Sequence, residues 1–280
     1  MKGKTVVATG ATSGIGEAAV LALARMGARI VFVARDQRRA EAALVKLERQ
    51  APRLGHSVHL ADLSLVAEAR RIGLAIAAQE RRVDVLINNA GAMFSGRRVT
   101  AEGLELTFAL NHMAYFTLTT ALRDRLAASA PARVVSTSSA AHKGVRLDFS
   151  DLQSERRYNG WRAYGHSKLA NILFTCELAR RLAGTGVTAN CFHPGVVATR
   201  FGSASGGLTG LLLPLARPFF SSPEQGADTL VYLASSPDVA NVTGAYFVMR
   251  EAAEPSAAAR DDSAAKRLWE ASEALVARLG

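Results

Sequence analysis

The sequence predicts a single α/β domain with a doubly wound parallel sheet of about seven strands, and three observations lead to this fold class. Short apolar runs alternate with helix-length segments along the whole chain. The first apolar run ends in a glycine-rich turn that leads directly into a helical pattern. Polar residues follow the ends of several runs, where a parallel sheet presents its ligand-binding edge.

The apolar runs are bounded by turn residues and have the length of buried strands. They lie near residues 5–9, 29–34, 57–60, 83–87, 133–137, 187–192 and 245–249. Helix-length segments lie between them, near residues 14–26, 37–50, 64–80, 102–127, 162–183 and 224–235. This alternation predicts parallel strands joined by right-handed crossovers, the Rossmann-type arrangement. Such a sheet binds its ligand outside the carboxyl ends of the strands, where the strand order reverses.

The turn after the first run, from Thr9 to Gly16, has the composition of a phosphate-binding turn. Glycine permits close approach of the backbone to a ligand, and the free N–H groups of a helix beginning near Ser13 or Gly14 favour an anion. The glycines are spaced Gly-x-x-x-Gly-x-Gly from Gly10, whereas the commoner dinucleotide-binding pattern is Gly-x-Gly-x-x-Gly. A pyrophosphate would fit here, and a tight strand-to-helix connection without a ligand is the alternative.

A second signal is the stretch Tyr164-Gly-His-Ser-Lys168, which is compatible with a helix. Residues four apart share a helix face, with Cβ atoms roughly 5–6 Å apart, so Lys168 can place positive charge beside the ring of Tyr164. A free tyrosine has a pKa of about 10, and a phenol that exchanges protons at neutral pH needs its anion stabilised. The pair therefore predicts an acid–base site, although two unrelated residues on a solvated helix face would have the same spacing.

The chain length and composition favour one domain spanning residues 1–280. No proline-, glycine- or serine-rich tract and no charge block divides the chain, which is long enough to bury a large core. The first strand follows Met1 to Lys4 directly, which leaves no room for a leader or a membrane anchor. Cys176 and Cys191 are too few for a disulfide framework. These features favour a cytoplasmic protein.

The net charge of +10 would also suit a protein that binds nucleic acid. The basic residues are scattered in short pairs such as Arg38-Arg39, with acidic residues between them. This pattern favours an ordinary solvated surface, so no nucleic-acid partner is expected. His142, His166 and His193 do not have the spacing of metal ligands, so no metal is expected.

Further motifs accompany the glycine turn and the tyrosine–lysine pair, namely Asn88-Asn89-Ala90-Gly91, Asn111, Ser138-Ser139 and Pro194-Gly195. In this order and at these separations, the motifs make nearly the whole chain resemble the short-chain dehydrogenase/reductase family. Within the family, Leu147 to Asn190 look most like the retinol dehydrogenase branch, and the chain is similar, more distantly, to light-dependent protochlorophyllide reductases. The resemblance implies a nicotinamide dinucleotide and hydride transfer between this cofactor and a carbonyl or alcohol.

The resemblance also implies a choice between the two nicotinamide cofactors. The second strand ends at Ala34, where NAD-preferring members of the family carry an acidic residue, and Arg35 follows. A guanidinium at this corner suits the 2′-phosphate of NADP(H), so NADP(H) is predicted in preference to NAD(H). Asp36 could instead pair with Arg35 or face the ribose, and Arg35 could belong to a surface ion pair.

Other positions match cofactor contacts of the family. Asp62 matches the position that contacts the adenine, with helix capping as its alternative role. Asn89 to Gly91 would line the adenosine side, and Pro194-Gly195 and Thr199 would shape and hold the nicotinamide carboxamide. The full implied set is Gly10, Thr12, Ser13, Gly14, Ile15, Gly16, Arg35, Asp62, Leu63, Asn89, Ala90, Gly91, Tyr164, Lys168, Pro194, Gly195, Val197 and Thr199.

Four catalytic positions follow from the resemblance. Tyr164 would donate a proton to the substrate carbonyl, while Lys168 would stabilise the tyrosinate and bind the nicotinamide ribose. Ser139 would hydrogen-bond the substrate oxygen, with Ser138 as the alternative. Asn111 would hold a water and relay protons through Lys168, and a buried amide bonded to a neighbouring carbonyl is compatible with the same role.

The interval between the serine and the tyrosine is longer than in many relatives, the extra material being roughly residues 142–161. This insertion includes Phe149, Tyr158 and Trp161. In the retinol dehydrogenase branch such an insertion borders the substrate pocket, which implies a lipophilic carbonyl. A loop that only covers the edge of the sheet is the alternative.

Two later segments bear on substrate and partners. Residues 200–222 occupy the position of the family's mobile substrate lid. Their apolar part, residues 207–220, is too short to span a membrane and could instead contact a membrane surface or another subunit. Residues 261–279 have helical periodicity and would cover the domain or a neighbouring subunit.

The predicted function is NADP(H)-dependent transfer of a hydride between the nicotinamide and a small-molecule carbonyl or alcohol, retinal or another aldehyde or ketone. A dinucleotide-binding sensor or scaffold without turnover is the alternative from another class, and protochlorophyllide-type photoreduction is a third interpretation. Relatives often pair through the helices that carry Asn111 and Tyr164, which suggests a homodimer or homotetramer. Peripheral contact with a membrane is left open.

Overall fold

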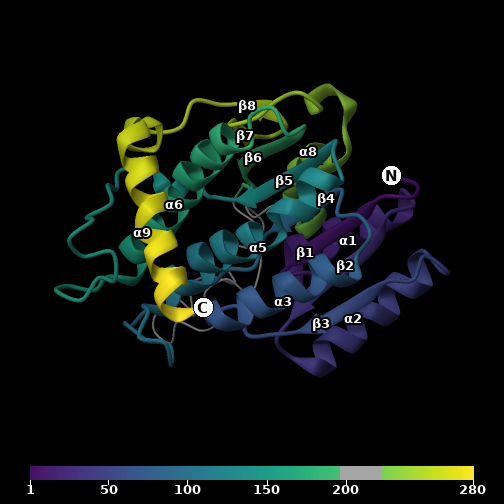
Figure 1. Cartoon of the computed structure of the whole chain (residues 1–280), viewed down its shortest axis with the longest axis horizontal. Coiled ribbons are helices and arrows are strands. Elements are labelled where there is room, and N and C mark those ends of the chain that lie inside the picture. The colour runs from purple at the N-terminus through teal and green to yellow at the C-terminus, as the bar shows by residue number, and fades with distance from the viewer. Residues whose placement is uncertain (196–221) are drawn as a thin grey trace.

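A computed structural model describes residues 1–195 and 222–280, and all of its strands belong to one eight-stranded sheet (Figure 1). In sequence they are β1 (Thr5–Thr9), β2 (Arg29–Ala34), β3 (Ser57–Leu60), β4 (Val85–Asn88), β5 (Ala132–Thr137), β6 (Val187–His193), β7 (Tyr246–Val248) and β8 (Glu251–Ala252). Their order across the sheet is β3-β2-β1-β4-β5-β6-β7-β8. The order reverses between β1 and β4, so the sheet is doubly wound and the predicted fold class is confirmed.

The first seven strands are parallel, as predicted. The eighth strand was not predicted, and it pairs antiparallel with β7 at the edge of the sheet. It has two residues and no apolar run, so the sequence carries no strand signal there. The strand forms because Met249 and Arg250, both with positive φ, turn the chain back onto β7.

Helices cover both faces of the sheet. They are α1 (Gly14–Arg25), α2 (Gln37–Gln50), α3 (Val66–Gln79), α4 (Leu106–Phe108), α5 (Ala114–Ala128), α6 (Gly160–Arg181), α8 (Pro223–Ser235) and α9 (Asp262–Leu279). One apolar core joins α1, α2 and α8 to one face. The other core joins α3, α5 and α6 to the opposite face and extends outward to α9.

The long helix predicted near residues 102–127 begins later than predicted and is not α-helical throughout. It begins at Leu106, where the Glu105 carboxylate accepts hydrogen bonds from the N–H groups of Thr107 and Phe108. A π-helical segment, Ala109–Met113, then separates α4 from α5. Such segments occur frequently at functional sites, and this one contains Asn111. Apolar periodicity does not distinguish a π-helical turn from an α-helical one.

The C-terminal helix covers its own domain. In Figure 1, α9 lies beside α6. The Trp269 ring centroid lies 4.9 Å from that of Phe116 on α5 and 5.9 Å from that of Phe174 on α6. Arg180 forms an ion pair of 2.7 Å with Asp262 at the start of α9. A second subunit that paired through α5 and α6 would therefore have to use surface that α9 leaves uncovered.

Candidate active site

The turn between β1 and α1 is tightly packed against the turn that follows β4. Gly10 and Gly14 have φ angles of 68° and 57°, which favour glycine. A Cβ atom on Gly16 would lie 2.1 Å from the main-chain oxygen of Gly10 and 2.5 Å from Nδ2 of Asn89. Ser13 precedes α1 in an extended conformation, and its side chain makes no capping hydrogen bond to that helix. The first N–H groups of α1 thus keep the arrangement that binds an anion.

Thr9 joins the two turns, and sequence reasoning did not single it out. Its hydroxyl oxygen accepts hydrogen bonds from the N–H groups of Asn89 and Ala90 at 2.9 and 3.0 Å. Its own hydroxyl donates to the main-chain oxygen of Ile87 at 3.3 Å. Its position directly before the glycine turn was the one feature of the sequence that could have indicated this role. This network places Asn89, Ala90 and the glycine turn at the same edge of the sheet.

At the corner after β2, the structure shows which groups Asp36 and Arg35 contact. Asp36 caps α2, because its carboxylate accepts a hydrogen bond of 2.9 Å from the N–H of Arg39. Arg35 instead lies 3.8 Å from the carboxylate of Asp62, with its side chain 75% exposed. An exposed pair at this distance is weak, so the guanidinium is accessible to another anion.

Asp62 holds the turn after β3 and does not cap α3. Its Oδ1 atom accepts hydrogen bonds from the N–H and the hydroxyl of Ser64 at 3.0 and 2.7 Å. Ser64 is a good N-cap by residue type, yet the residue at the N-cap position of α3 is Leu65. The carboxylate of Glu102, from a distant loop, accepts hydrogen bonds from the N–H groups of Val66 and Ala67. Leu63 is buried and belongs to the apolar core on the face of the sheet that α3 covers.

Tyr164 and Lys168 lie one turn apart on α6 and are almost fully buried, at 8% and 2% exposure. Lys168 Nζ lies 5.5 Å from the centroid of the Tyr164 ring. It donates a hydrogen bond of 3.1 Å to the main-chain oxygen of Thr137 at the end of β5. Burial raises the pKa of Tyr164 and lowers that of Lys168 to about 7. Each charged form is therefore disfavoured by burial and depends on nearby charge or hydrogen bonds.

The structure distinguishes the two serines after β5. The hydroxyl of Ser138 is buried and donates a hydrogen bond of 2.8 Å to the main-chain oxygen of Lys168. The Ser139 hydroxyl accepts a bond of 3.2 Å from the N–H of Ala141. Ser139 also hydrogen-bonds Tyr164, which opposes the effect of burial by lowering the pKa of Tyr164. This arrangement favours Ser139 as the serine beside the reacting group.

Asn111 is fully buried in the π-helical segment. Its Oδ1 accepts from the N–H of Ala92 at 2.9 Å, and its Nδ2 donates to the oxygen of Ala92 at 2.9 Å and to the hydroxyl of Ser167 at 3.0 Å. A Cβ atom on Gly91 would lie 3.1 Å from Asn111 Oδ1 and 3.6 Å from Lys168 Nζ. The side chain of Asn111 is thus a buried amide that is hydrogen-bonded to a neighbouring carbonyl. This arrangement is compatible with a role in relaying protons.

The remaining predicted positions lie after β6. Pro194 and Gly195 follow this strand directly, and Gly195 has a φ of 81°. Val197 and Thr199 lie outside the described residues, as do the apolar segment 207–220 and the predicted lid except for Ser222. Among the residues that are described, no group of three or more His, Cys, Asp or Glu side chains could hold a metal ion. No helix within residues 1–195 and 222–280 is long and apolar enough to cross a membrane.

Proteins of one known family resemble this chain in sequence. A model of the short chain dehydrogenase family matches residues 4–206. Retinol dehydrogenase 14 of Mus musculus is 42% identical over 99% of this chain and 86% of its own length. Retinol dehydrogenase 13 of Homo sapiens is 43% identical over 98% of this chain and 85% of its own length.

Solved structures also resemble the chain. A crystal structure of an uncharacterised protein from Mycobacterium paratuberculosis has a TM-score of 0.78 and 34% identity, covering 99% of this chain and 94% of that one. A blue fluorescent protein from a metagenomic library, in complex with NADPH, has a TM-score of 0.69 and 31% identity, covering 88% and 96%. The chain therefore belongs to the short-chain dehydrogenase/reductase family, oxidoreductases that bind a nicotinamide cofactor, and within this family it is retinol dehydrogenase-like.

Proposed function

We propose that this protein reduces a lipophilic aldehyde or ketone with NADPH, and oxidises the corresponding alcohol in the reverse direction. The observation that carries the proposal is the convergence of Tyr164, Lys168, Ser139 and Asn111 on one edge of the sheet, beside the glycine turn. An acid–base pair next to a dinucleotide-binding turn is the arrangement that hydride transfer requires.

The residues of the glycine turn fit a dinucleotide. The missing side chains of Gly10 and Gly16 allow the turn to pack on Asn89 and Ala90, and α1 begins there with N–H groups suited to a pyrophosphate. The family-implied contacts with the nicotinamide are Pro194, Gly195, Val197 and Thr199, with Lys168 on its ribose. The bound cofactor supplies the hydride.

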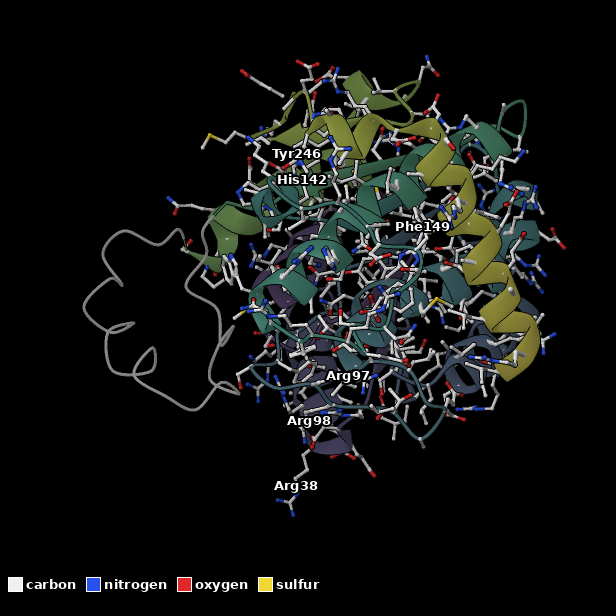
Figure 2. All side chains as sticks on the ribbon, turned by 90° about the vertical axis from the view of Figure 1, so that its left-hand side faces the viewer. Arg38, Arg97, Arg98, His142, Phe149 and Tyr246 are labelled. Atoms are coloured by element: carbon white, nitrogen blue, oxygen red, sulfur yellow. The ribbon has the colours of Figure 1, made fainter. Side chains whose placement is uncertain are left out.

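The corner after β2 favours NADP(H). Arg35 is exposed and only weakly paired, and the neighbouring carboxylate of Asp36 is already used to cap α2. Figure 2 shows Arg38, in the first turn of α2, extending outward, which adds positive charge near this corner. A 2′-phosphate would gain charge-assisted hydrogen bonds from Arg35. The solved relative in complex with NADPH supports the same cofactor.

The environment of Tyr164 suits a proton donor. Burial raises the pKa of its phenol, which keeps the proton in place until a substrate oxygen can accept it. Lys168, 5.5 Å from the ring centroid, stabilises the tyrosinate that remains after transfer. Ser139 hydrogen-bonds the substrate oxygen, and the buried amide of Asn111 holds the loop at Ala92 close to Lys168.

Trp161 supports a lipophilic substrate. It is 65% exposed, and its ring centroid lies 6.2 Å from that of Tyr164. The other two aromatic residues of the insertion pack against the protein: Tyr158 hydrogen-bonds the oxygen of Phe94, and Phe149 lies beneath the guanidinium of Arg267 on α9. Trp161 thus offers an apolar surface beside the proton donor. The names of the retinol dehydrogenase relatives support a retinal-like substrate.

Location and partners are predicted from the sequence. The cytoplasmic location and the peripheral membrane contact of residues 207–220 stay predictions from the sequence. A homodimer or homotetramer also stays a prediction, and any such assembly would leave α9 in place over α5 and α6.

The decisive test compares NADPH oxidation by the wild type and by Tyr164→Phe across a panel of aldehydes and ketones that includes retinal. We expect the variant to bind NADPH normally and to lose roughly 10²- to 10⁴-fold in kcat, because the proton donor is removed. Tyr232→Phe, on α8, is the matched control and should keep wild-type activity. Absence of wild-type turnover despite tight NADPH binding would instead support a sensor or scaffold.

A further inference from the structure

The C-terminal part of the chain, residues 251–280, lies beyond the span that matches the family model, which ends at residue 206. Two buried histidines connect it to the candidate active site. We propose that His112 and His142 are positioning residues through which residues 251–280 hold Asn111 and Ser139 in place. This inference rests on the proposed function of that site.

His142 connects Ser139 to the C-terminal segment. The N–H of Ser256 donates a hydrogen bond of 3.1 Å to Nε2 of His142. Because a main-chain N–H can only donate, Nε2 is the unprotonated nitrogen and the ring proton is on Nδ1. Nδ1 lies 2.7 Å from the main-chain oxygen of Ser139 and therefore donates to it. The neutral ring thus bridges Ser139 and Ser256 in a single tautomer.

Packing holds the His142 ring in this orientation. The side chain is fully buried, and Figure 2 shows it beside Tyr246 on β7. The two ring centroids are 5.2 Å apart in an edge-to-face arrangement. His142 also ends the short helical turn Ala140–His142, which begins directly after Ser139. Movement of the segment around Ser256 would consequently be transmitted to Ser139.

His112 makes the second connection, next to Asn111 in the π-helical segment. Its Nε2 lies 3.0 Å from the hydroxyl oxygen of Ser272 on α9. That hydroxyl donates its one proton to the main-chain oxygen of Leu268 at 2.8 Å, so it must accept the bond from His112. His112 is therefore protonated on Nε2, the opposite nitrogen from His142.

The surroundings of His112 extend this connection to the catalytic lysine. The His112 ring is fully buried, and burial lowers its pKa to about 4, an effect opposed by the neighbouring side chain of Asn171. Nδ2 of Asn171 donates a bond of 3.1 Å to the main-chain oxygen of Thr137, which also accepts the bond from Lys168 Nζ. Asn171, which neighbours His112, is thus hydrogen-bonded to the same carbonyl that holds Lys168.

Ser272→Ala tests the first link with a closely matched control. It leaves the buried N–H of His112 without an acceptor, so His112 and the adjacent Asn111 should shift. We expect kcat to fall about 10-fold or more, since small misplacements of catalytic groups are costly, with NADPH affinity unchanged. Ser235 on α8 donates to Val231 one turn earlier, as Ser272 does to Leu268, so Ser235→Ala removes the same type of bond away from the site. It should leave kcat unchanged.

The pH profile of alcohol oxidation separates positioning from a general loss of stability. If Ser272 positions the groups around Lys168, the tyrosinate is less well stabilised in Ser272→Ala, and the pH needed for half-maximal kcat/KM should rise. Ser272→Thr, which keeps the hydroxyl, should restore the profile toward that of the wild type. A loss of thermal stability with an unchanged profile and unchanged kcat would overturn the positioning role.

His142→Phe tests the second link. It keeps an aromatic ring against Tyr246 and removes both hydrogen bonds. His56 provides the control, because it is also buried and bridges two main-chain groups, accepting from the N–H of Ile30 and contacting the oxygen of Ala51, both at 3.0 Å. Both Phe variants should lose stability, but only His142→Phe should lose kcat about 10-fold or more. Equal kcat in the two variants would overturn the inference.

Nitrogen-15 NMR of the histidine rings provides a measurement that does not depend on turnover. We expect the proton of His112 on Nε2 and that of His142 on Nδ1, and the His112 signal should change in Ser272→Ala but not in Ser235→Ala. The opposite tautomers would overturn the inference even in an active enzyme. If the tautomers are as expected but the wild type does not turn over any substrate, both the proposed function and the catalytic role of these contacts are wrong. If the wild type turns over normally and Ser272→Ala and His142→Phe keep its kcat, the inference is wrong but the proposed function stands.

Discussion

The ammonium nitrogen of Lys168 lies 5.5 Å from the centre of the Tyr164 ring and is bonded to the main-chain oxygen of Thr137. Both side chains are nearly inaccessible to water. Burial raises the pKa of the phenol and lowers that of the ammonium to about 7, so burial works against the charge that catalysis requires on each group. The burial of these two groups has a cost in stability, which can be measured.

Lys168→Met should reveal that cost as a pH dependence. The pKa of Lys168 falls from 10.5 to about 7 on folding, so between these values the unfolded chain binds a proton that the native chain does not. Wild-type stability should therefore rise from pH 7 to 10.5 relative to the variant, by on the order of 5 kcal/mol at most, at about 1.4 kcal/mol per pKa unit. Urea unfolding of the cofactor-free proteins measures this difference.

The control for this experiment is Lys266→Met, because Lys266 is exposed on α9. Its stability difference from the wild type should be nearly constant over the same pH range. If the stability difference between the wild type and Lys168→Met is also constant with pH, folding does not lower the pKa of Lys168 and the prediction is wrong.

Arg35→Ala should change the choice of cofactor. We expect the Kd for NADPH to rise about 10- to 100-fold, equivalent to losing a hydrogen bond to a charged group of about 1.5–3 kcal/mol, with the Kd for NADH almost unchanged. Fluorescence titration with both cofactors measures the ratio. Arg49→Ala, in the last turn of α2, is the control and should leave both affinities unaltered. An unchanged ratio in Arg35→Ala would refute the phosphate contact.

Gly16→Ala should disrupt the cofactor-binding turn. The added Cβ would lie 2.1 Å from the main-chain oxygen of Gly10, which cannot move without displacing the turn. We expect lower thermal stability and at least 10-fold weaker NADPH binding, since overpacking typically costs about 1–3 kcal/mol. At Gly96 a Cβ would meet no atom within 4 Å, so Gly96→Ala should behave as the wild type. Wild-type binding by Gly16→Ala would show that the turn is not tightly packed.

Trp161→Ala should affect large apolar substrates selectively. Trp161 lies beside Tyr164 with most of its surface exposed, so its removal takes away contact area without altering the proton donor. We expect kcat/KM for retinal to fall about 10-fold or more, and kcat/KM for a short aldehyde to change by less than about twofold. Trp161→Phe should have an intermediate effect. Equal losses for both substrates would place Trp161 outside the substrate pocket.

The candidate site could be predicted largely because its residues occupy ends of strands. Apolar runs identified the seven parallel strands, and the rule for doubly wound sheets then placed the glycine turn, Asn89 and Ser139 on one edge. The four-residue spacing of Tyr164 and Lys168 likewise predicted that they share a helix face. Residues close in sequence have their relative positions determined by helix and strand geometry.

Contacts between distant segments were decided only by the tertiary structure. Glu102 caps α3 in place of Ser64, and α9 packs on its own domain. The bonds of His112 to Ser272 and of Ser256 to His142 join residues that are 160 and 114 positions apart. Periodicity in the sequence records which face of each element is buried, whereas the pairing of one polar group with another depends on how the finished elements pack. The sequence by itself therefore determined the candidate reacting groups, and the folded chain decided what holds them in place.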